Sequence, residues 1–506
     1  MADDDNTTDP TREQTPTGSP NLTRRALITG GSLIGAGLVV GGTLLGQQIA
    51  GAKASPTPTT NKPPMRTFAS TGLTTPVVTS WRTGTTAPGL VFVTQQVAGF
   101  NGSIMEESGE PVWIEPTTAN LTDLKVQQFD GRPVLTYWTG TSTGGHGSGS
   151  GTILDDTYAK VATVRAGNGL DADLHEFNLT DRGTALITIY TVVKTDLSAV
   201  GGVTNGYVYD CHVQEVDVRT GKVLLDWSAL DHIPIGDTHL TLTQDPGHDG
   251  TAAGRAFDAY HLNAVEEDGD ALLVSARHTH TVYSIDRTTG KVRWRFGGKQ
   301  SDIALPTDAV FAWQHDVRRH PDGTITLFDN HLYSGTDGQS GGLRFSLDET
   351  SDIATLEQTF AYDGHLGTAM GSVQVLANGN VLVGWGTDPA VTEFTYAGAA
   401  IYEATLGSIS YRASRHPWVA HPSTAPDIAA RAESGGVRVF ASWNGATEVA
   451  RWRILAGDDA ATLQAAATVP RSGFETAHLV PRAKVVAVQA LDSAGAVLAT
   501  SRTLTV

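Results

Sequence analysis

The feature of this chain that most constrains its fold is a loosely repeated pattern of short apolar runs and tight turns. Four segments share it: residues 175–190 (HEFNLTDRGTALITIY), 262–277 (LNAVEEDGDALLVSAR), 315–330 (HDVRRHPDGTITLFDN) and 371–386 (GSVQVLANGNVLVGWG). Runs of β-branched and aromatic residues separated by D-G or N-G turns favour antiparallel strands joined by hairpins. Because no long amphipathic helical period interrupts them across 67–407, the pattern predicts an all-β fold of similar units.

Two further segments look like the closing strands of such units. Residues 213–227 (VQEVDVRTGKVLLDW) and 282–294 (VYSIDRTTGKVRW) are nearly superimposable, and each passes through T-G-K into a strand that contains a tryptophan. An irregular repeat of four-stranded units predicts a β-propeller, and about six units fit between residues 66 and 407. A stack of β-sandwiches stays open as the alternative.

The chain changes character after residue 407. Alternating strands and small-residue turns occupy residues 437–446, 449–457 and 483–506. This pattern predicts a compact C-terminal β-sandwich of the fibronectin type III kind over 408–506. Its histidines are scattered and lack clustered carboxylates, so we expect a packing or surface-binding role for this domain.

The N-terminus has the layout of an export signal. Paired arginines at 24–25 precede an uncharged, glycine-rich stretch at 26–45 and an A-K-A sequence at 52–54. This combination predicts a twin-arginine signal over 1–54, followed by a Pro/Thr-rich linker at 55–65. We expect export by the twin-arginine machinery and a secreted or cell-envelope location. An uncleaved segment of about twenty apolar residues would instead serve as a membrane anchor.

Charge and cysteine content exclude several classes of protein. The 35 Lys and Arg residues against 53 Asp and Glu give a formal net charge of −18, which argues against a nucleic-acid partner and a polybasic membrane surface. The single cysteine, Cys211, allows no intrachain disulfide and no cysteine-rich metal site. It follows Y-V-Y-D in a strand-like run, so we expect a buried, inert thiol.

Three polar residues border predicted strands and form the candidate catalytic group. They are His261 in A-Y-H-L-N, Arg277 in S-A-R-H and His315 in W-Q-H-D. Any one histidine at the start of a strand is usually a hydrogen-bonding residue at a turn. Polar groups at strand ends of an all-β scaffold can, however, converge on one point, and a spacing of 277 − 261 = 16 residues suits one strand–turn–strand unit.

These motifs in combination resemble the arylsulfotransferase family. The resemblance extends upstream to D-A-D-L-H-E-F at 171–177 and downstream to the M-G-S-V-Q segment that begins at Met370, and covers most of residues 64–414. It implies a propeller enzyme that moves a sulfuryl group from a phenolic sulfate donor to a phenolic acceptor without a nucleotide. The family relationship implies no organic cofactor, and no metal motif is visible.

The resemblance also implies a role for each candidate residue. His315 would be the nucleophile that is transiently sulfated, His261 and Arg277 would hold the sulfuryl oxygens, and His175 would exchange a proton with the phenol oxygen. Sulfuryl transfer resembles phosphoryl transfer, in which charge is spread over three peripheral oxygens. Histidine can be a neutral nucleophile near pH 7, arginine presents a fork to two oxygens, and an N-sulfated imidazole would give ping-pong kinetics.

Neighbouring residues invite weaker expectations. Asn263 and Gln314 flank candidate positions and are expected to orient them, while His278 stays ambiguous. Asp329 and Asn330 are expected either to support the site residues or to form a turn, and the sequence leaves both open. His280 is expected on a strand surface. His146, in the glycine-rich run G-G-H-G-S-G-S-G, is expected in a flexible connection, with a place at the mouth of the pocket as the alternative.

Other functions remain as alternatives. The T-G-K closings are also typical of quinoprotein dehydrogenases, although only two copies occur and one cysteine cannot form their vicinal pair. A non-catalytic extracellular binding or scaffold propeller would not require the histidine–arginine group. A glycosidase or lyase is less favoured because no convincing acid pair stands out.

Overall fold

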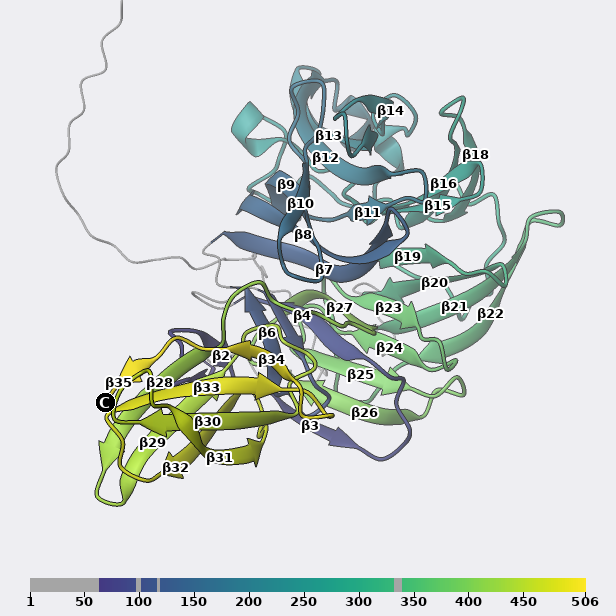
Figure 1. The fold of residues 1–506 in the computed structure, drawn as a ribbon. Helices are drawn as coiled ribbons and strands as arrows, with labels where there is room; N and C mark the ends of the chain where they lie inside the picture. The colour runs from purple at the N-terminus through teal and green to yellow at the C-terminus, as the bar shows by residue number, and fades with distance from the viewer. Residues whose placement is uncertain (1–62, 97–101, 116–118, 332–338) are drawn as a thin grey trace, which may run out of the picture. The chain divides into compact units, whose positions relative to one another are not determined.

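Nearly all of the regular structure is antiparallel β-sheet (Figure 1). The computed structural model describes residues 63–96, 102–115, 119–331 and 339–506, so the expected export signal lies outside the described residues. The helices within these ranges are single 3₁₀ turns: η1 (Ser198–Val200), η2 (Ile235–Asp237) and η3 (Ala253–Arg255). In this part of the chain no helix has the length and apolar character that crossing a membrane requires.

Four four-stranded sheets follow one another along the chain, each built from consecutive strands. The first sheet contains β7 (Asn120–Phe129), β8 (Arg132–Thr143), β9 (His146–Leu154) and β10 (Lys160–Val164), and the second contains β11 (Phe177–Leu179), β12 (Thr184–Thr195), β13 (Gly206–Asp217) and β14 (Val223–Ser228). The third contains β15 (Leu262–Asp268), β16 (Ala271–Ala276), β17 (Thr281–Asp286) and β18 (Val292–Gly297), and the fourth contains β19 (His315–Arg319), β20 (Thr324–Asp329), β21 (Gly341–Asp348) and β22 (Ile353–Phe360). The predicted all-β class is therefore confirmed, and the arrangement is propeller-like.

Two more sheets combine strands from distant parts of the sequence. The first joins β23 (Ser372–Val375), β24 (Val381–Gly384), β25 (Ala390–Phe394) and β26 (Ala400–Thr405) to β3 (Thr79–Arg82), and the second joins β27 (Ser410–His416) to β4 (Leu90–Gln95), β5 (Gly102–Met105) and β6 (Pro111–Glu115). A short pair, β1 (Met65–Thr67) and β2 (Thr74–Pro76), precedes them. Since β27 pairs with β4, this region of sheets extends beyond residue 407 to His416.

Turn chemistry explains why the repeated sequence segments fold alike. In both T-G-K turns a glycine in the left-handed region, Gly221 (φ 70°) or Gly290 (φ 71°), donates its N–H to the backbone oxygen of Asp217 or Asp286 at 2.8 Å. Each aspartate also accepts a backbone N–H three residues later through its side chain, at 2.7 and 2.8 Å. The local sequence thus sets the last hairpin of two sheets in the same way.

Apolar side chains fill the space between successive sheets. Leu186 and Tyr283 belong to one buried cluster between the β11–β14 and β15–β18 sheets, and Val282 and Phe345 to the next. The series continues until Phe92 and Tyr137 link the sheet containing β4 to the β7–β10 sheet. Each sheet therefore buries both of its faces, which places its inner polar strand ends where they can meet.

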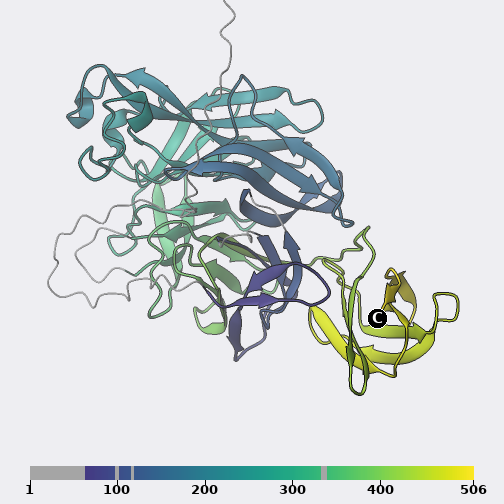
Figure 2. The ribbon, with the colours of Figure 1, turned by 90° about the vertical axis from the view of Figure 1, so that its left-hand side faces the viewer.

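The C-terminal strands form two further sheets around one apolar core (Figure 2). One contains β28 (Asp427–Glu433), β29 (Gly436–Ser442) and β32 (Glu475–Val480), and the other contains β30 (Arg451–Gly457), β31 (Gln464–Pro470), β33 (Val485–Leu491), β34 (Val497–Thr500) and β35 (Leu504–Thr505). Val439 of the first sheet and Trp452 and Val488 of the second share that core.

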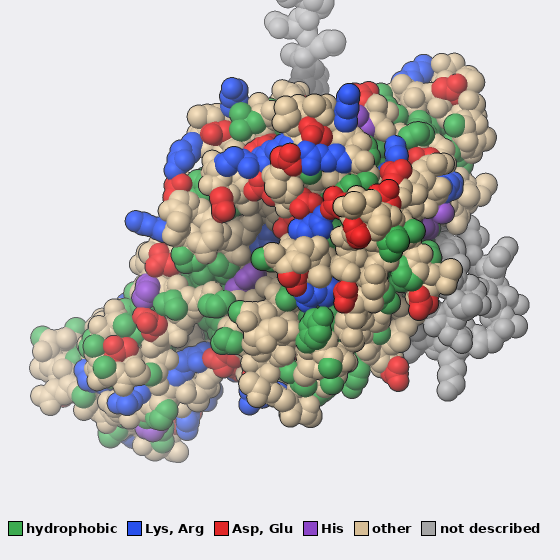
Figure 3. All heavy atoms as spheres, turned by 90° about the vertical axis from the view of Figure 1, so that its right-hand side faces the viewer, with side chains coloured by type: hydrophobic (Ala, Val, Ile, Leu, Met, Phe, Trp, Pro, Cys, Tyr) green, Lys and Arg blue, Asp and Glu red, His purple; other side chains and the backbone are tan. Residues whose placement is uncertain are grey.

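Charges of both signs intermingle on the face shown in Figure 3. Elsewhere in the described residues ion pairs join charged side chains; Arg319 contacts Asp268 at 2.8 Å and Glu349 at 2.9 Å. This face offers no continuous basic patch of the kind that a nucleic-acid backbone requires.

Candidate active site

His315 begins β19 with its imidazole held in one orientation. Its Nδ1 lies 2.6 Å from Oδ1 of Asn330, which follows β20, the neighbouring strand. Asn330 donates its amide N–H groups to the backbone oxygens of Gly367 (2.6 Å) and Met370 (3.0 Å). Because the amide nitrogen is occupied, Oδ1 must face the imidazole, and His315 Nδ1 must carry the proton.

The other ring nitrogen of His315 therefore carries an electron pair. Nε2 accepts a hydrogen bond from the backbone N–H of Met370, with the two nitrogens 3.3 Å apart. Burial, followed by the charge of Arg277, holds the pKa of His315 well below its usual value, and His261 and His175 act in the same direction. A neutral imidazole with an unprotonated Nε2 has the properties of a nucleophile.

His261 precedes β15 and pairs with a buried carboxylate. Its Nδ1 lies 2.5 Å from Asp258 Oδ2, and Nε2 of His146 lies 2.9 Å from the same oxygen. Burial alone would raise the pKa of Asp258, but the imidazoles of His261, His278 and His146 hold it well below its usual value. Burial lowers the pKa of His261 to about 3, against the opposing effect of Asp258. His261 also has φ 56°, an unfavourable backbone conformation for this residue.

His175 precedes β11 and has an equivalent partner. Its Nδ1 lies 2.5 Å from Asp173 Oδ2, and its backbone N–H donates to the same oxygen at 3.0 Å. The second carboxylate oxygen of Asp173 accepts the backbone N–H of Gly147, at the start of β9, at 2.6 Å. The pair is therefore fixed by two neighbouring sheets, and Nε2 of His175 is left available.

Arg277 follows β16, and several contacts fix its guanidinium. Nη1 donates to Nε2 of His278 at 2.9 Å, and Nη2 reaches the backbone oxygen of Thr368 at 3.5 Å. The guanidinium carbon lies 4.8 Å from the ring centre of Trp313. His278 in turn donates from Nδ1 to the backbone oxygen of Asp258 at 2.5 Å, so its Nε2 accepts the arginine proton. His278, ambiguous in the sequence, thus orients Arg277.

The structure brings the four predicted residues together at the inner ends of three sheets. The rings of His175 and His261 have centres 4.8 Å apart, and Arg277 donates its backbone N–H to the backbone oxygen of His261 at 2.9 Å. Arg277, His261 and His175 are also the neighbouring groups that disfavour a proton on His315 and so lower its pKa. Their catalytic roles stay predictions.

A buried ionic network lies beside this cluster on the inner strands. Arg412 contacts Asp123 at 2.7 Å and Glu176 at 2.8 Å, and Arg318 and Lys125 reach the Glu176 carboxylate at 2.9 and 3.1 Å. Burial alone would raise the pKa of Glu176, but these three cations lower it well below its usual value. The network ties the inner strands β7, β19 and β27 together around the residue that follows His175.

One group among the described residues has ligand atoms close enough for a metal ion. The atoms of His146, Asp258 and His261 all lie within 4.8 Å of one another. Two of their separations, 2.9 and 2.5 Å, are hydrogen-bond lengths. An ion with bonds of about 2.0–2.2 Å would hold its ligand atoms about 3 Å apart or more. The arrangement therefore fits hydrogen bonding between imidazoles and a carboxylate.

Two expectations about histidines were wrong. His146 does not lie in a flexible connection: it begins β9, is buried, and contacts Asp258. Burial alone would lower its pKa, but Asp258 raises it. His280 is not on a strand surface either, because it is buried, with its ring stacked 4.0 Å from that of His239 and edge-on to Trp313.

The remaining neighbours have structural roles. Asn263 donates to the backbone oxygen of Gln314 at 2.7 Å, and Gln314 donates to the backbone of β16 and β17, so both connect strands. Cys211 is a buried free thiol, as expected. Sequence reasoning missed Asp173 and Asp258, although D-L-H and D-A-Y-H place an acid two or three positions before each histidine.

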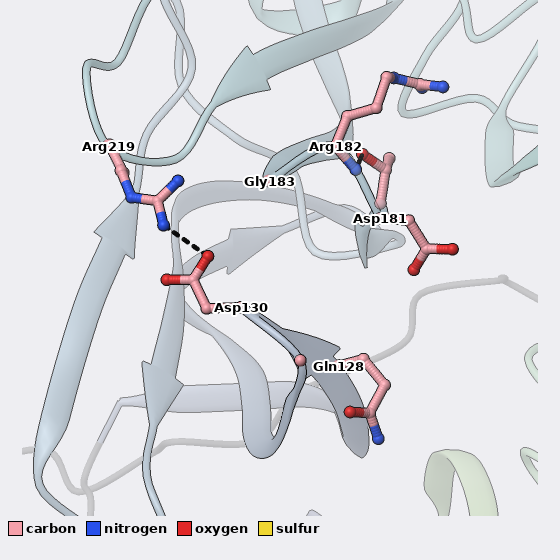
Figure 4. A pocket seen from close by; sticks show the side chains of 8 residues that line it. Gln128, Asp130, Asp181, Arg182, Gly183 and Arg219 are labelled. Carbon is pink, nitrogen blue, oxygen red and sulfur yellow. Dashed lines mark hydrogen bonds and ion pairs between the residues drawn. The ribbon is translucent and has the colours of Figure 1, made fainter.

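A competing hollow of about 350 Å³ lies among the outer turns (Figure 4). Asp130, Asp181, Arg182 and Arg219 line it, and the Arg219 guanidinium points to Asp130 at 2.5 Å. Its lining contains no histidine, and its one hydroxyl, of Thr180, is bonded to Thr184 at 2.6 Å. The histidine cluster is therefore the better candidate active site.

Residues 125–407, which are 283 of 506 residues, match the family described as Arylsulfotransferase (ASST). No curated protein matches the chain. Similar solved structures include proteins of unknown function from Bacteroides caccae (11% identity, TM-score 0.39, covering 65% of this chain and 98% of that chain) and from Dyadobacter fermentans (12%, 0.38, 71% and 95%). A streptogramin B lyase is similar at 12% identity and TM-score 0.30, covering 65% of this chain and 97% of that chain. At these TM-scores, none of the three informs the reaction.

Proposed function

Because the chain belongs to the arylsulfotransferase family, we propose that it transfers a sulfuryl group from an aryl sulfate ester to a phenolic acceptor through a sulfated His315. The family membership confirms the resemblance seen in the sequence and supports a sulfotransferase. We further propose that the transfer follows a ping-pong route and that each of the four residues has the role described below.

The observation that carries the proposal is the difference between the partners of three histidines. Nδ1 of His175 and Nδ1 of His261 each face a carboxylate, Asp173 or Asp258, which stabilises an imidazolium. Nδ1 of His315 faces the neutral amide of Asn330 instead. His175 is therefore suited to exchanging a proton with the phenol oxygen, whereas His315 stays neutral and nucleophilic.

The first half-reaction follows from this division. Nε2 of His315 attacks the sulfur, the S–N bond forms, and the S–O bond to the aryl group breaks. The aryl oxide leaves with the bonding electron pair and takes a proton from Nε2 of protonated His175. Arg277, fixed by His278, neutralises charge on the sulfuryl oxygens.

The second half-reaction reverses these steps with a different phenol. His175 takes the proton of the acceptor hydroxyl while its oxygen attacks sulfur, the S–N bond breaks, and the electron pair returns to His315. Asp173 stabilises the imidazolium that His175 becomes. His261, whose Nδ1 faces Asp258, takes no proton from the phenol in this scheme and holds a sulfuryl oxygen beside Arg277.

The experiment uses p-nitrophenyl sulfate with and without phenol. We expect phenol-dependent release of p-nitrophenol, a peptide containing His315 that gains one sulfuryl group before phenol is added, and a fall on the order of 10⁴-fold in His315→Ala. The matched control is His320→Ala, since His320 follows the same strand but bonds only to Thr326 among its side-chain neighbours. Release that survives in His315→Ala would refute the nucleophile, and no release from any aryl sulfate would favour a non-catalytic binding propeller.

We also propose a six-bladed propeller with a C-terminal sandwich, and a location outside the cytoplasm. The six sheets, with apolar clusters between successive pairs, support a six-bladed propeller that ends at about His416, and the shared core of β28–β35 supports a C-terminal sandwich. The paired arginines at 24–25 support export and a location outside the cytoplasm. Replacing both with lysine should retain the protein in the cytoplasm, as measured by cell fractionation.

A further inference from the structure

Asn330 connects His315 to the loop that lies over its reactive nitrogen. We propose that Asn330 is a positioning residue that fixes the reactive tautomer of His315 and holds the 367–371 loop against it. The inference rests on the proposed function, whose nucleophile is His315. No family motif among those above contains a role for this amide.

The orientation of the Asn330 amide is determined by its surroundings. The side chain is fully buried, and its nitrogen donates to two backbone oxygens, of Gly367 and Met370, which cannot donate in return. Its oxygen can therefore only accept, and it accepts from His315 Nδ1 at 2.6 Å. A reversed amide would bring its oxygen against the two backbone oxygens and lose both hydrogen bonds. The structure thus permits one tautomer, with the proton on Nδ1 and the electron pair on Nε2.

The same amide sets the position of the loop. By binding the backbone oxygens of Gly367 and Met370, Asn330 fixes two points of the 367–371 loop. Met370 has φ 64° and Gly371 φ 105°, so the loop keeps a backbone conformation that side chains disfavour. This conformation directs the backbone N–H of Met370 to Nε2 of His315, to which it donates a hydrogen bond at 3.3 Å. Once that nitrogen is sulfated, the N–H can donate to a sulfuryl oxygen instead.

An amide suits this position better than a carboxylate. A carboxylate on Nδ1 would favour the imidazolium and would protonate the nucleophile near neutral pH. It would also repel the backbone oxygens of Gly367 and Met370. The other charged or titratable groups facing His315 are Arg277, His261 and His175, which disfavour its protonation. With a neutral partner, those effects keep Nε2 unprotonated.

Two substitutions test the role. Asn330→Asp keeps the shape and should make kcat/KM fall on the acid side of neutrality, with a new limb between about pH 5 and 8 as the pKa of His315 rises. Asn330→Ala should lower kcat by about 10²-fold and leave KM for the aryl sulfate within about threefold, without that limb. Ser340→Ala is the matched control, because the Ser340 hydroxyl contacts the backbone oxygens of Asn330 and Gly367 at 3.2 Å without touching the imidazole. Ser340→Ala should lower the stability of the protein, and its pH dependence of kcat/KM should match that of wild type.

Nitrogen NMR of the full chain with ¹⁵N-labelled histidine reads the tautomer independently of activity. We expect Nδ1 of His315 to be protonated in wild type and the two tautomers to mix in Asn330→Ala. A protonated Nε2 in wild type, or an unchanged tautomer in the folded variant, would overturn the inference. So would a pH profile of Asn330→Asp that matches Ser340→Ala. A wild type with the expected tautomer but no transfer would refute the proposed function and leave the tautomer assignment intact.

Discussion

His365 provides the clearest test of how the loop over the active site is held. Its Nδ1 lies 3.0 Å from Asp388 and its Nε2 3.0 Å from Glu403, while its ring stacks on Trp385 with centres 4.8 Å apart. Both contacts require an N–H, so the imidazole is charged. Burial alone would lower the pKa of His365, but the two carboxylates raise it to about 9.

The magnitude follows from that pKa. A rise from 6.5 to about 9 corresponds to about 3.4 kcal/mol, at 1.36 kcal/mol per pKa unit, and solvent screening reduces it to about 2 kcal/mol. Because the folded pKa lies above the unfolded value, this stabilisation is complete below pH 6.5 and is lost as the pH rises through about 9. His365→Gln should therefore lower the melting temperature by about 3 °C at pH 6, for a unit of roughly 340 residues, and far less at pH 10.

Thermal unfolding of wild type and variant at pH 6 and pH 10 measures the effect. The matched control is His421→Gln, since His421 also lies between two carboxylates, Glu448 and Asp156, but its side chain is 52% exposed. The control should melt like wild type at both pH values. An equal loss for His365→Gln at pH 6 and pH 10 would refute the ion-pair argument, because packing alone does not change with pH.

Three further outcomes are expected. Arg277→Lys keeps the charge but loses the fork that contacts His278 and a second acceptor, so kcat should fall about 10²-fold, and steady-state kinetics that match wild type would contradict this. Arg412→Met leaves Glu176 and Asp123 buried without their closest cation and should cost about 3–5 kcal/mol in urea unfolding, whereas a smaller loss than about 1 kcal/mol would show that water reaches them. Because burial and Arg277 depress the pKa of His315, the burst of p-nitrophenol should keep its amplitude at pH 5 within about twofold of pH 7, and its disappearance would contradict a neutral nucleophile.

The strands were predictable because their information is local. D-G and N-G turns and the T-G-K closings fix hairpins through their own backbone and side-chain bonds, as the matched bonds of Asp217 and Asp286 show. The pairing of β27 with β4 and of β26 with β3 was not visible, since no local signal names a partner hundreds of residues away.

Some residues of the candidate site were also predictable from local sequence, and others were not. His175, His261, Arg277 and His315 stood out because each borders a strand-like run, and the structure places them together. Their carboxylate partners Asp173 and Asp258 did not stand out, because hydrogen-bond orientation depends on the packed backbone. The bonds of Asn330 to the 367–371 loop could not be foreseen either, for the same reason. His146 was misplaced for a related reason, since a glycine-rich run was interpreted as mobile when its glycines admit the close packing of β8 and β9 against Trp138.

The pairing of β27 with β4 delays one step of folding until the chain is nearly complete. Phe92 pairs with Ser414, which follows it by 414 − 92 = 322 positions, so β4 cannot gain this partner until the ribosome has made β27. Until then β4 has an open edge whose unpaired N–H and C=O groups can recruit a strand of another nascent chain. Chains that stop before Ser410 are therefore expected to aggregate, whereas chains that reach His416 can pair β27 with β4.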